Sequence, residues 1–292
     1  MQSQMKQNYK ISISMKKTVV PMMMGVVALS ANVQAKGKME VYDFEQFKLH
    51  VYYTNDALGD ASYIVEGKDA LITLEEPLFK DNIAEFATYV ETLQKPIVQR
   101  ISDYHVGGTA HHAVIMPQGM PKFVKEPAYS GMMQHFSQVF GDAITELPTG
   151  ETQEVEFYRT YHYADISFLF SHGANTDFPA ASILIGGKVY YTHWTPLKTH
   201  INPLQLTCRE AVDAELEALS NALSSGAELF IGGHGGATDV ESVEFRKTYL
   251  QTLKKLLEEC STADEWISRM KQAFPGLPAE ESLPELAKVL YK

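Results

Sequence analysis

Two strand-rich halves, each with helices beside it, constrain the fold of this chain more than any other feature of its sequence. In the first half the predicted short strands, separated by Gly or Asp turns, are residues 48–54, 61–67 and 69–76. In the second half they are residues 152–163, 165–172, 180–187 and 188–194. Because helical segments flank both halves, the sequence predicts an α/β fold of four layers, an αββα sandwich of helix, sheet, sheet and helix.

Apolar spacing predicts the helices. Ile83, Phe86, Val90 and Leu93 fall on one face of a helix, and a strand over 96–102 follows it. The other predicted helices are residues 129–140, 209–226 and 240–259, with short helices after residue 263. A buried strand over 227–233 ends at a glycine-rich turn, and the loop after residue 101 also follows a strand. Layered α/β folds bind ligands at such strand ends.

The N-terminus reads as a targeting segment. Met15, Lys16 and Lys17 precede an apolar run over 18–30, and Val33-Gln34-Ala35 is a small-residue cleavage signal. This pattern predicts a signal peptide over residues 1–35, with residues 1–14 an upstream extension if translation starts at Met15. The run is short and contains Pro21, which disfavours a stable membrane anchor. We therefore expect a periplasmic or secreted protein with a single domain over residues 36–292.

The charge of the chain bears on its partners. The formal net charge is −11, and cleavage after residue 35 would change it from −11 to −15, because four lysines and no acid precede that point. An acidic surface repels phosphate backbones, so nucleic acid is not expected as a partner. We expect a small-molecule substrate instead. Cys208 and Cys260 are the two cysteines. Export would permit a disulfide between them, and two free thiols on separate helices fit the sequence equally well.

Two glycine-rich loops carry the candidate ligands. The stretch ISDYHVGGTAHH, residues 101–112, places His105 before Val-Gly-Gly and two residues after Asp103. A second histidine, His234, follows the strand LFIGG and precedes two glycines. Imidazole is a common metal ligand, so both loops are candidate metal-binding segments.

The order of these motifs resembles the metallo-β-lactamase superfamily over nearly all of residues 36–292. The segments that carry the resemblance are ASYIVEGKDALITLEE, YHVGG, NTDFPAASILIGGKVYYTHW and LFIGGHGG. The resemblance implies a four-layer sandwich in which histidines and aspartates on loops at one edge hold one or two zinc ions. Those ions would activate a water and polarise the bond that is cleaved.

This sequence departs from the ligand pattern of that family. Its main loop reads His-x-His-x-Asp-His-x-Gly-Gly, and the residues found at the first three ligand positions are Arg100, Ser102 and Tyr104. The middle histidine falls on Asn175 and the bridging aspartate on Trp194. Of seven ligand positions only His105 and His234 persist. Arginine would repel a dication and tryptophan would fill the space of a second one, so we expect at most one metal ion.

Residues next to the replaced ligand positions could supply the remaining ligands of one metal ion. Asp103, His193 and His172 each lie close in sequence to a replaced ligand, and Asp177 flanks Asn175. The predicted catalytic residues are Asp103, His105 and His234, and the predicted metal ligands are His105, His234, His193 and His172. Arg100, Tyr104 and Trp194 are predicted either to contact substrate or to pack into a collapsed cleft. Adjacent His111 and His112 are expected on the surface of a helix that begins after Gly108, and Ser102 lacks the context of a serine nucleophile.

Two functions fit this pattern. The first is an exported hydrolase with one zinc or other divalent ion, acting on an ester-like small molecule. The alternative is a metal-free protein that binds a small molecule, glycan or protein in the old cleft. Both require His105, His193, His234, Tyr104 and Trp194 to meet at one pocket. Since few ligands persist, we expect the apolar strands rather than a metal to hold the fold together.

Overall fold

The computed structural model describes residues 17–20, 37–109, 111–146, 150–174 and 179–291. Residues 21–30 of the predicted apolar run over 18–30, and the predicted cleavage signal, lie outside these ranges. Within the described ranges, no helix combines the length and apolar character needed to cross a bilayer.

The described residues form two sheets, and the larger has eight strands in chain order from β1 to β8. Its antiparallel half, from β1 to β5, is a β-meander that contains the three strands predicted over 48–54, 61–67 and 69–76, and its last three pairings, from β5 to β8, are parallel. The strands are β1 (Lys17–Val20), β2 (Lys38–Asp43), β3 (Lys48–Tyr53), β4 (Ala61–Glu66), β5 (Leu71–Leu74), β6 (Ile97–Ile101), β7 (Val114–Pro117) and β8 (Thr152–Val155).

The second sheet has six strands in the order β14-β13-β12-β11-β10-β9. Its pairings are antiparallel except between β12 and β13, which run parallel and so end at the same edge. The strands are β9 (Arg159–Tyr163), β10 (Ile166–His172), β11 (Ala181–Ile185), β12 (Val189–Trp194), β13 (Leu229–His234) and β14 (Gly236–Thr238).

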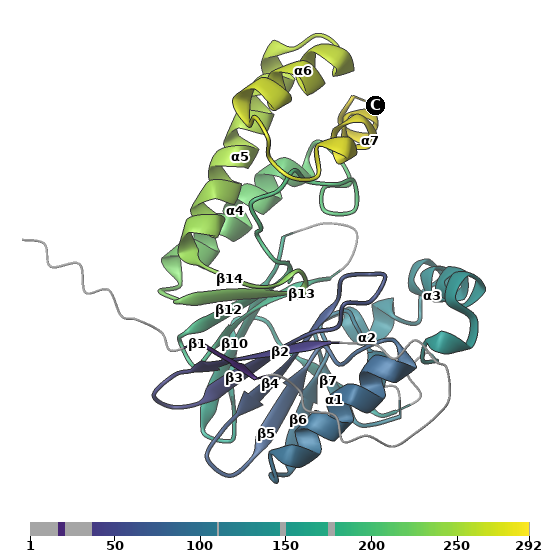
Figure 1. Ribbon diagram of the computed structural model, residues 1–292, viewed down its shortest axis with the longest axis vertical. Coiled ribbons are helices and arrows are strands. Elements are labelled where there is room, and N and C mark those ends of the chain that lie inside the picture. Colours follow the sequence, from purple (N-terminus) through teal and green to yellow (C-terminus); the bar gives the residue numbers. More distant parts are fainter. Residues whose placement is uncertain (1–16, 21–36, 110, 147–149, 175–178, 292) are drawn as a thin grey trace, which may run out of the picture.

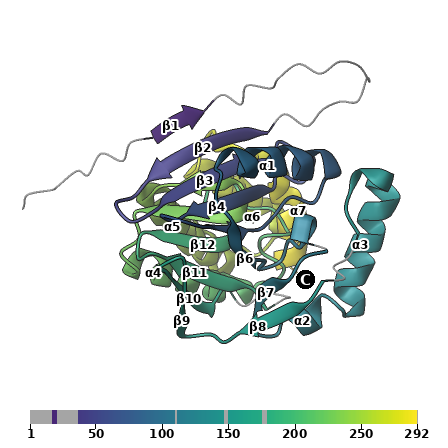
Figure 2. The ribbon, with the colours of Figure 1, turned by 90° about the horizontal axis from the view of Figure 1, so that it is seen from below.

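Helices cover the outer face of each sheet. They are α1 (Lys80–Thr92), α2 (Met120–Phe123), α3 (Pro127–Phe140), α4 (Ala211–Ser224), α5 (Val240–Glu259), α6 (Ala263–Ala273) and α7 (Leu283–Leu290). Figure 1 shows α4 and α5 against the sheet that contains β12–β14, and α1 on the far side against the sheet that contains β4–β6. Figure 2, seen from below, shows α5, α6 and α7 behind the strands and α3 to one side. The predicted αββα sandwich is confirmed.

Apolar side chains hold the layers together. The inner faces of the two sheets share one cluster that includes Leu49, Val65, Phe168, Phe170 and Tyr191, all fully buried. A second cluster joins β12 and β13 to the helices from α4 onward, and a smaller one joins α1 to its sheet. These contacts need no ligand, because burial of apolar area is itself the main stabilising term of a domain this size.

Two local predictions need correction. The predicted strand over 152–163 is divided between the sheets: β8 ends the first and β9 begins the second, because Tyr158 takes a φ of 60° and turns the chain. The predicted helix after Gly108 is a single 3-10 turn, Gly107–Thr109. Gly107 lies against the backbone of the β5–α1 connection, where an added Cβ would lie 2.0 Å from the carbonyl oxygen of Pro77. Only glycine fits this approach.

The cysteines and the N-terminal strand complete the fold. Cys208 and Cys260 are free thiols, half-buried and buried respectively, so the open question of a disulfide is resolved in favour of two thiols. Strand β1 pairs antiparallel with β2, although its residues fall within the predicted signal peptide. Cleavage after residue 35 would remove β1 and leave β2 as the edge of its sheet.

The helix layer over β12 and β13 contains a testable buried charge. Burial raises the pKa of Glu215 on α4 to about 7, and it lowers the pKa of Arg246 on α5 to about 10. Between about pH 4.5 and about pH 7, the Glu215 carboxyl keeps its proton in the folded protein and loses it in the unfolded chain. The free energy of unfolding therefore falls as the pH rises through this range. We expect Glu215→Gln to match the wild type near pH 4 and to exceed its free energy of unfolding at pH 8 by up to about 3 kcal/mol.

Urea unfolding at a series of pH values measures this difference. Glu217→Gln, the same substitution at an exposed position on α4, serves as the control and should show no such pH dependence. A gain for Glu215→Gln that is equal at pH 4 and pH 8 would contradict the assignment.

Candidate metal centre

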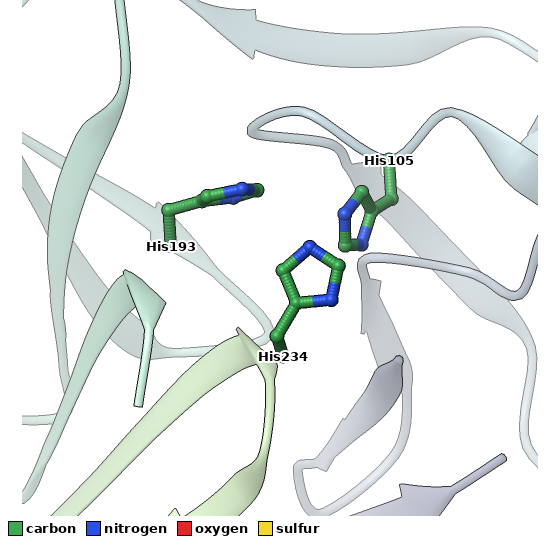
Figure 3. Close-up of side chains that lie close together, drawn as sticks. All are labelled: His105, His193 and His234. Atoms are coloured by element: carbon green, nitrogen blue, oxygen red, sulfur yellow. The ribbon is translucent and has the colours of Figure 1, made fainter. Parts of the chain in front are cut away.

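Three histidines from three strand ends meet at one point. His105 lies in the loop after β6, His193 lies in β12, and His234 is the last residue of β13. One ring nitrogen from each lies within 4.8 Å of the others, and Figure 3 shows the three rings turned toward a common centre. The parallel pairing of β12 and β13, with Trp194 opposite His234, brings His193 and His234 to the same edge.

Local backbone geometry explains why His234 ends its strand. Gly235 and Gly236 both take positive φ values, 91° and 76°, and turn the chain into the short strand β14. At Gly236 an added Cβ would lie 2.0 Å from the ring of Tyr53, so this position also excludes a side chain. The glycines that mark this motif in the sequence therefore fix the point at which the imidazole leaves the sheet.

A buried carboxylate, Glu75, shapes the loop that carries His105. Its two oxygens accept backbone hydrogen bonds from the N–H groups of Asp103, Tyr104 and His105. Oxygen Oε2 also lies 3.3 Å from Nδ1 of His105. Glu75 comes directly after β5 and is 1% exposed. It therefore fixes both the backbone of the loop and the direction of the imidazole, leaving Nε2 of His105 for the centre.

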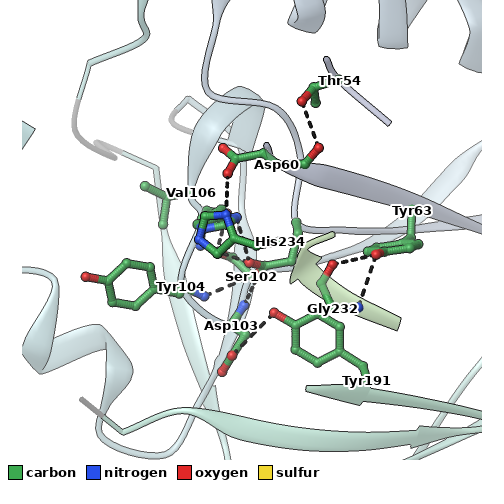
Figure 4. Close-up of polar contacts among 12 residues, drawn as sticks. Thr54, Asp60, Tyr63, Ser102, Asp103, Tyr104, Val106, Tyr191, Gly232 and His234 are labelled. Carbon is green, nitrogen blue, oxygen red and sulfur yellow. Dashed lines mark hydrogen bonds and ion pairs between the residues drawn. The ribbon is translucent and has the colours of Figure 1, made fainter. Parts of the chain in front are cut away.

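Asp60 supports His234 in the same way. Its Oδ1 lies 2.9 Å from Nδ1 of His234, and the two residues also form an isolated β-bridge. Figure 4 shows this pair beside the hydrogen bond that the Thr54 hydroxyl donates to the backbone carbonyl of Asp60. Metal-bound histidines usually donate their second ring N–H to a carboxylate, which fixes the tautomer and the ring orientation. Asp60 and Glu75 occupy that place for His234 and His105.

Burial keeps two of the imidazoles uncharged. It lowers the pKa of His105 to about 4, although the nearby Asp60 carboxylate acts in the opposite direction. Burial also places the pKa of His193 well below its usual range, with the charges of His105 and His234 acting in the same direction. Both rings are therefore neutral near pH 7, and the neutral ring is the form that coordinates a metal.

The donor set fits one divalent ion. Three imidazoles with carboxylates behind two of them are the ligand number and chemistry of a catalytic zinc site, which keeps a fourth position open. Metal–nitrogen bonds of about 2.0–2.1 Å place tetrahedral ligand nitrogens about 3.4 Å apart, so the three rings need only small shifts to bind one ion. Among the described residues, no second group of this kind is present.

A pocket of about 440 Å³ opens over the histidines. Tyr104 and Trp194 line it together with His105, His193 and His234, so the structure brings together the five residues expected to converge. Trp194 stacks on His234 with ring centroids 4.1 Å apart and an interplanar angle of 21°. The tryptophan therefore occupies one side of the centre, as expected for a residue that replaces a ligand of a second ion. The roles given to these residues stay predictions.

Arg100 and Asp103 lie elsewhere than expected. Arg100 forms an ion pair with Glu76, 3.3 Å from Nε to Oε1, and it does not line the pocket. Asp103 is fully buried, and its carboxylate accepts hydrogen bonds from the backbone N–H of Ala181 and the hydroxyl of Tyr191. Burial and the charge of Glu75 raise its pKa. Asp103 thus joins the loop to the second sheet and does not line the pocket, and the catalytic role given to it stays a prediction.

The remaining sequence candidates also lie away from the centre. His172 is an exposed residue whose ring packs on Phe157 at 3.9 Å between centroids, so the predicted ligand role of His172 needs correction. Ser102 is buried, and its hydroxyl donates to the backbone carbonyl of His105, which leaves it no part as a nucleophile. His111 and His112 are exposed. Asn175 and Asp177 lie outside the described residues.

Sequence reasoning missed the two supporting carboxylates. Asp60 lies 174 positions before His234 in the numbering, and Glu75 lies 30 before His105, so no local spacing connects either pair. One signal was available for each. Asp60 stands at a turn that enters a strand, and Glu75 is the first of the two acids that end the run DALITLEE, where an acid directly after an apolar strand has no packing role.

Comparison with known proteins supports the fold alone. No protein-family model matches the sequence, and no curated protein sequence matches it either. The structure is similar to that of a double mutant of the sec-alkylsulfatase PisA1, with a TM-score of 0.60 and 14% identity over 85% of this chain and 49% of that one. The chain therefore spans about half the length of that relative.

Two further structures cover most of their own length. The metallo-β-lactamase family protein TTHA1429 from Thermus thermophilus has a TM-score of 0.53 and 16% identity over 78% of this chain and 86% of that one. The metallo-β-lactamase DIM-1 has a TM-score of 0.50 and 15% identity over 73% and 97%. The chain has the metallo-β-lactamase fold.

Proposed function

We propose that this protein is a hydrolase that holds one divalent metal ion through His105, His193 and His234. The observation that carries the proposal is the meeting of these three imidazoles, at the ends of strands far apart in sequence, within 4.8 Å of one another. Buried carboxylates lie against two of the three rings, which is the usual arrangement behind metal-bound histidines. The set includes His193, which stands one residue before the position of the lost bridging aspartate.

Each residue of the site has a definite task in this proposal. A bound zinc-type ion would supply a water of lowered pKa and polarise the bond to be broken. Asp60 and Glu75 orient His234 and His105, and burial keeps His105 and His193 neutral. Trp194 restricts the space beside His234, and the apolar walls of the pocket exclude bulk water from the reacting group.

The site of action in this proposal is outside the cytoplasm. Its support is the N-terminal pattern alone: a basic start at Lys16 and Lys17, an apolar run over 18–30, and the small-residue signal before residue 36. In the same proposal the partner is a small molecule rather than nucleic acid, because the chain is acidic.

Metal analysis of the purified wild-type protein tests the proposal. The protein is stripped with a chelator, supplied with excess Zn²⁺, Mn²⁺ or Fe²⁺, and passed through a desalting column before elemental analysis. We expect about one equivalent of one of these ions per chain and chelator-sensitive hydrolysis of an activated ester. Less than a tenth of an equivalent for all three ions would overturn the proposal. The stripped protein should keep its far-ultraviolet circular dichroism, since the apolar clusters hold the fold.

A metal-free binding protein is the second candidate. The observation that favours it is the stacking of Trp194 on His234, which covers one face of the His234 imidazole. An aromatic surface of this kind would suit a planar or apolar guest. The two candidates differ in a single measurement, because this second function predicts that no supplied ion is retained after desalting.

A further inference from the structure

The pocket over the three histidines is apolar for most of its surface. Its far wall comes from α3 and the segment before it, which contribute Phe123, Met132, Met133 and Phe136, and Leu58 and Leu204 lie at its rim. The histidine centre therefore lines an apolar chamber of about 440 Å³, a size typical of small-molecule sites.

The charged groups at this chamber argue against a ligand that is anionic along the wall formed by α3. No lysine or arginine is among the described residues that line it, and its one carboxylate, Asp60, lies against His234. Arg100, which stands at a former ligand position, is paired with Glu76. A phosphate, sulfate or carboxylate group on the part of a ligand that lies along α3, away from the histidines and their metal ion, would lose its hydration without gaining a cation. The guest is uncharged along this part.

The wall residues suit a flexible aliphatic chain. Met132 and Met133 are adjacent on α3, and unbranched thioether side chains fill irregular space and adapt to guests of different length. The hydroxyl of Tyr104 donates to the sulfur of Met132, which places a weakly polar contact beside the histidines. The side chains of α3 and its preceding segment that line the chamber, apart from the Tyr129 hydroxyl, are apolar. A polar reacting group thus belongs at the histidine end and a hydrocarbon chain along α3.

We propose that the substrates are uncharged carboxylic esters with an aliphatic acyl chain, which lies along α3 with its carbonyl at the histidines. This proposal rests on the proposed hydrolase function. In the reaction, the oxygen of water bonds to the carbonyl carbon and the bond from that carbon to the alcohol oxygen breaks. One proton of the water is transferred to the alcohol oxygen, so the products are a carboxylic acid and an alcohol, and no oxidant or reductant is required.

Binding to the metal-stripped protein tests the chamber without any turnover. Isothermal titration calorimetry with methyl esters from butanoate to decanoate should show the Kd falling by up to about fourfold per added methylene, until the chamber is full. A Kd that does not change with chain length would overturn the proposal.

Hydrolysis by the metal-loaded protein tests the orientation of the chain. For p-nitrophenyl esters from acetate to decanoate, kcat/KM should rise with acyl length. For alkyl acetates, in which the chain is on the alcohol, kcat/KM should change little. A rise confined to the alkyl acetates would overturn the acyl assignment.

A charge placed in the wall provides a matched pair of variants. Met132→Glu should weaken binding of methyl decanoate at least tenfold, because the chain would meet a carboxylate, and it should leave the bound metal unchanged. Gln134→Glu adds the same charge at an exposed position two residues away on α3 and should bind like the wild type. Equal binding by the two variants would contradict the proposal. If esters bind as expected but no metal is retained, the proposed hydrolase function fails and the chamber assignment stands. If metal is retained but binding does not depend on chain length, the chamber assignment fails and the hydrolase function stands.

Discussion

His193→Ala is expected to leave the protein folded and to reduce its bound metal from about one equivalent per chain to less than about a tenth. His193 supplies one of three ring nitrogens, and two imidazoles alone do not make a tight site. Elemental analysis after metal supply and desalting measures the loss, and circular dichroism shows that the fold persists. Hydrolysis of activated esters should fall to the uncatalysed rate together with the metal.

His172→Ala is the matched control for this experiment. His172 was an equal candidate ligand in the sequence, but its ring packs on Phe157 at the surface, so its removal should change neither metal content nor hydrolysis. Asp60→Asn should give an intermediate result, with metal affinity about 10–100-fold weaker, because the support of His234 is altered and all three ligands remain. Full metal retention by His193→Ala would contradict the proposed centre.

Glu75→Ala is expected to lower the free energy of unfolding by about 3–5 kcal/mol. Three backbone N–H groups, from Asp103, Tyr104 and His105, donate to this one buried carboxylate, and alanine would leave all of them without an acceptor. The loss is large because a buried donor without a partner pays its full desolvation cost. Denaturant unfolding of the metal-stripped protein measures it without a contribution from bound metal.

Two further variants serve as comparisons for the stability of Glu75→Ala. Glu75→Gln keeps one carbonyl oxygen as an acceptor and should lie between the wild type and Glu75→Ala. Glu91→Ala removes an exposed carboxylate on α1 and should change stability by less than about 0.5 kcal/mol. If Glu75→Ala were no less stable than Glu91→Ala, the loop that carries His105 would depend on something other than Glu75.

The sequence determined the secondary structure and the location of the site. Alternation and helical spacing are local properties, so the meander, α1, β6 and the long helix α5 (Val240–Glu259) could be predicted from them. The glycines after His105 and His234 are also local signals, since close backbone approach at Gly107 and positive φ at Gly236 exclude side chains. Both histidines were therefore identified, together with the pocket that Tyr104 and Trp194 share with them.

Only the tertiary structure decided which neighbours complete the centre. Asp103, His172 and His193 were equivalent by sequence, each close to a lost ligand, and only His193 lies at the centre. The pairing of β12 with β13 brings His193 to His234, whereas the carboxylate of Asp103, in the loop after β6, accepts hydrogen bonds from Ala181 and Tyr191. The partners of His105 and His234, which are Glu75 and Asp60, come from other strand ends. Their positions depend on how the sheets are stacked and which strand edges coincide, and local periodicity carries no information about either.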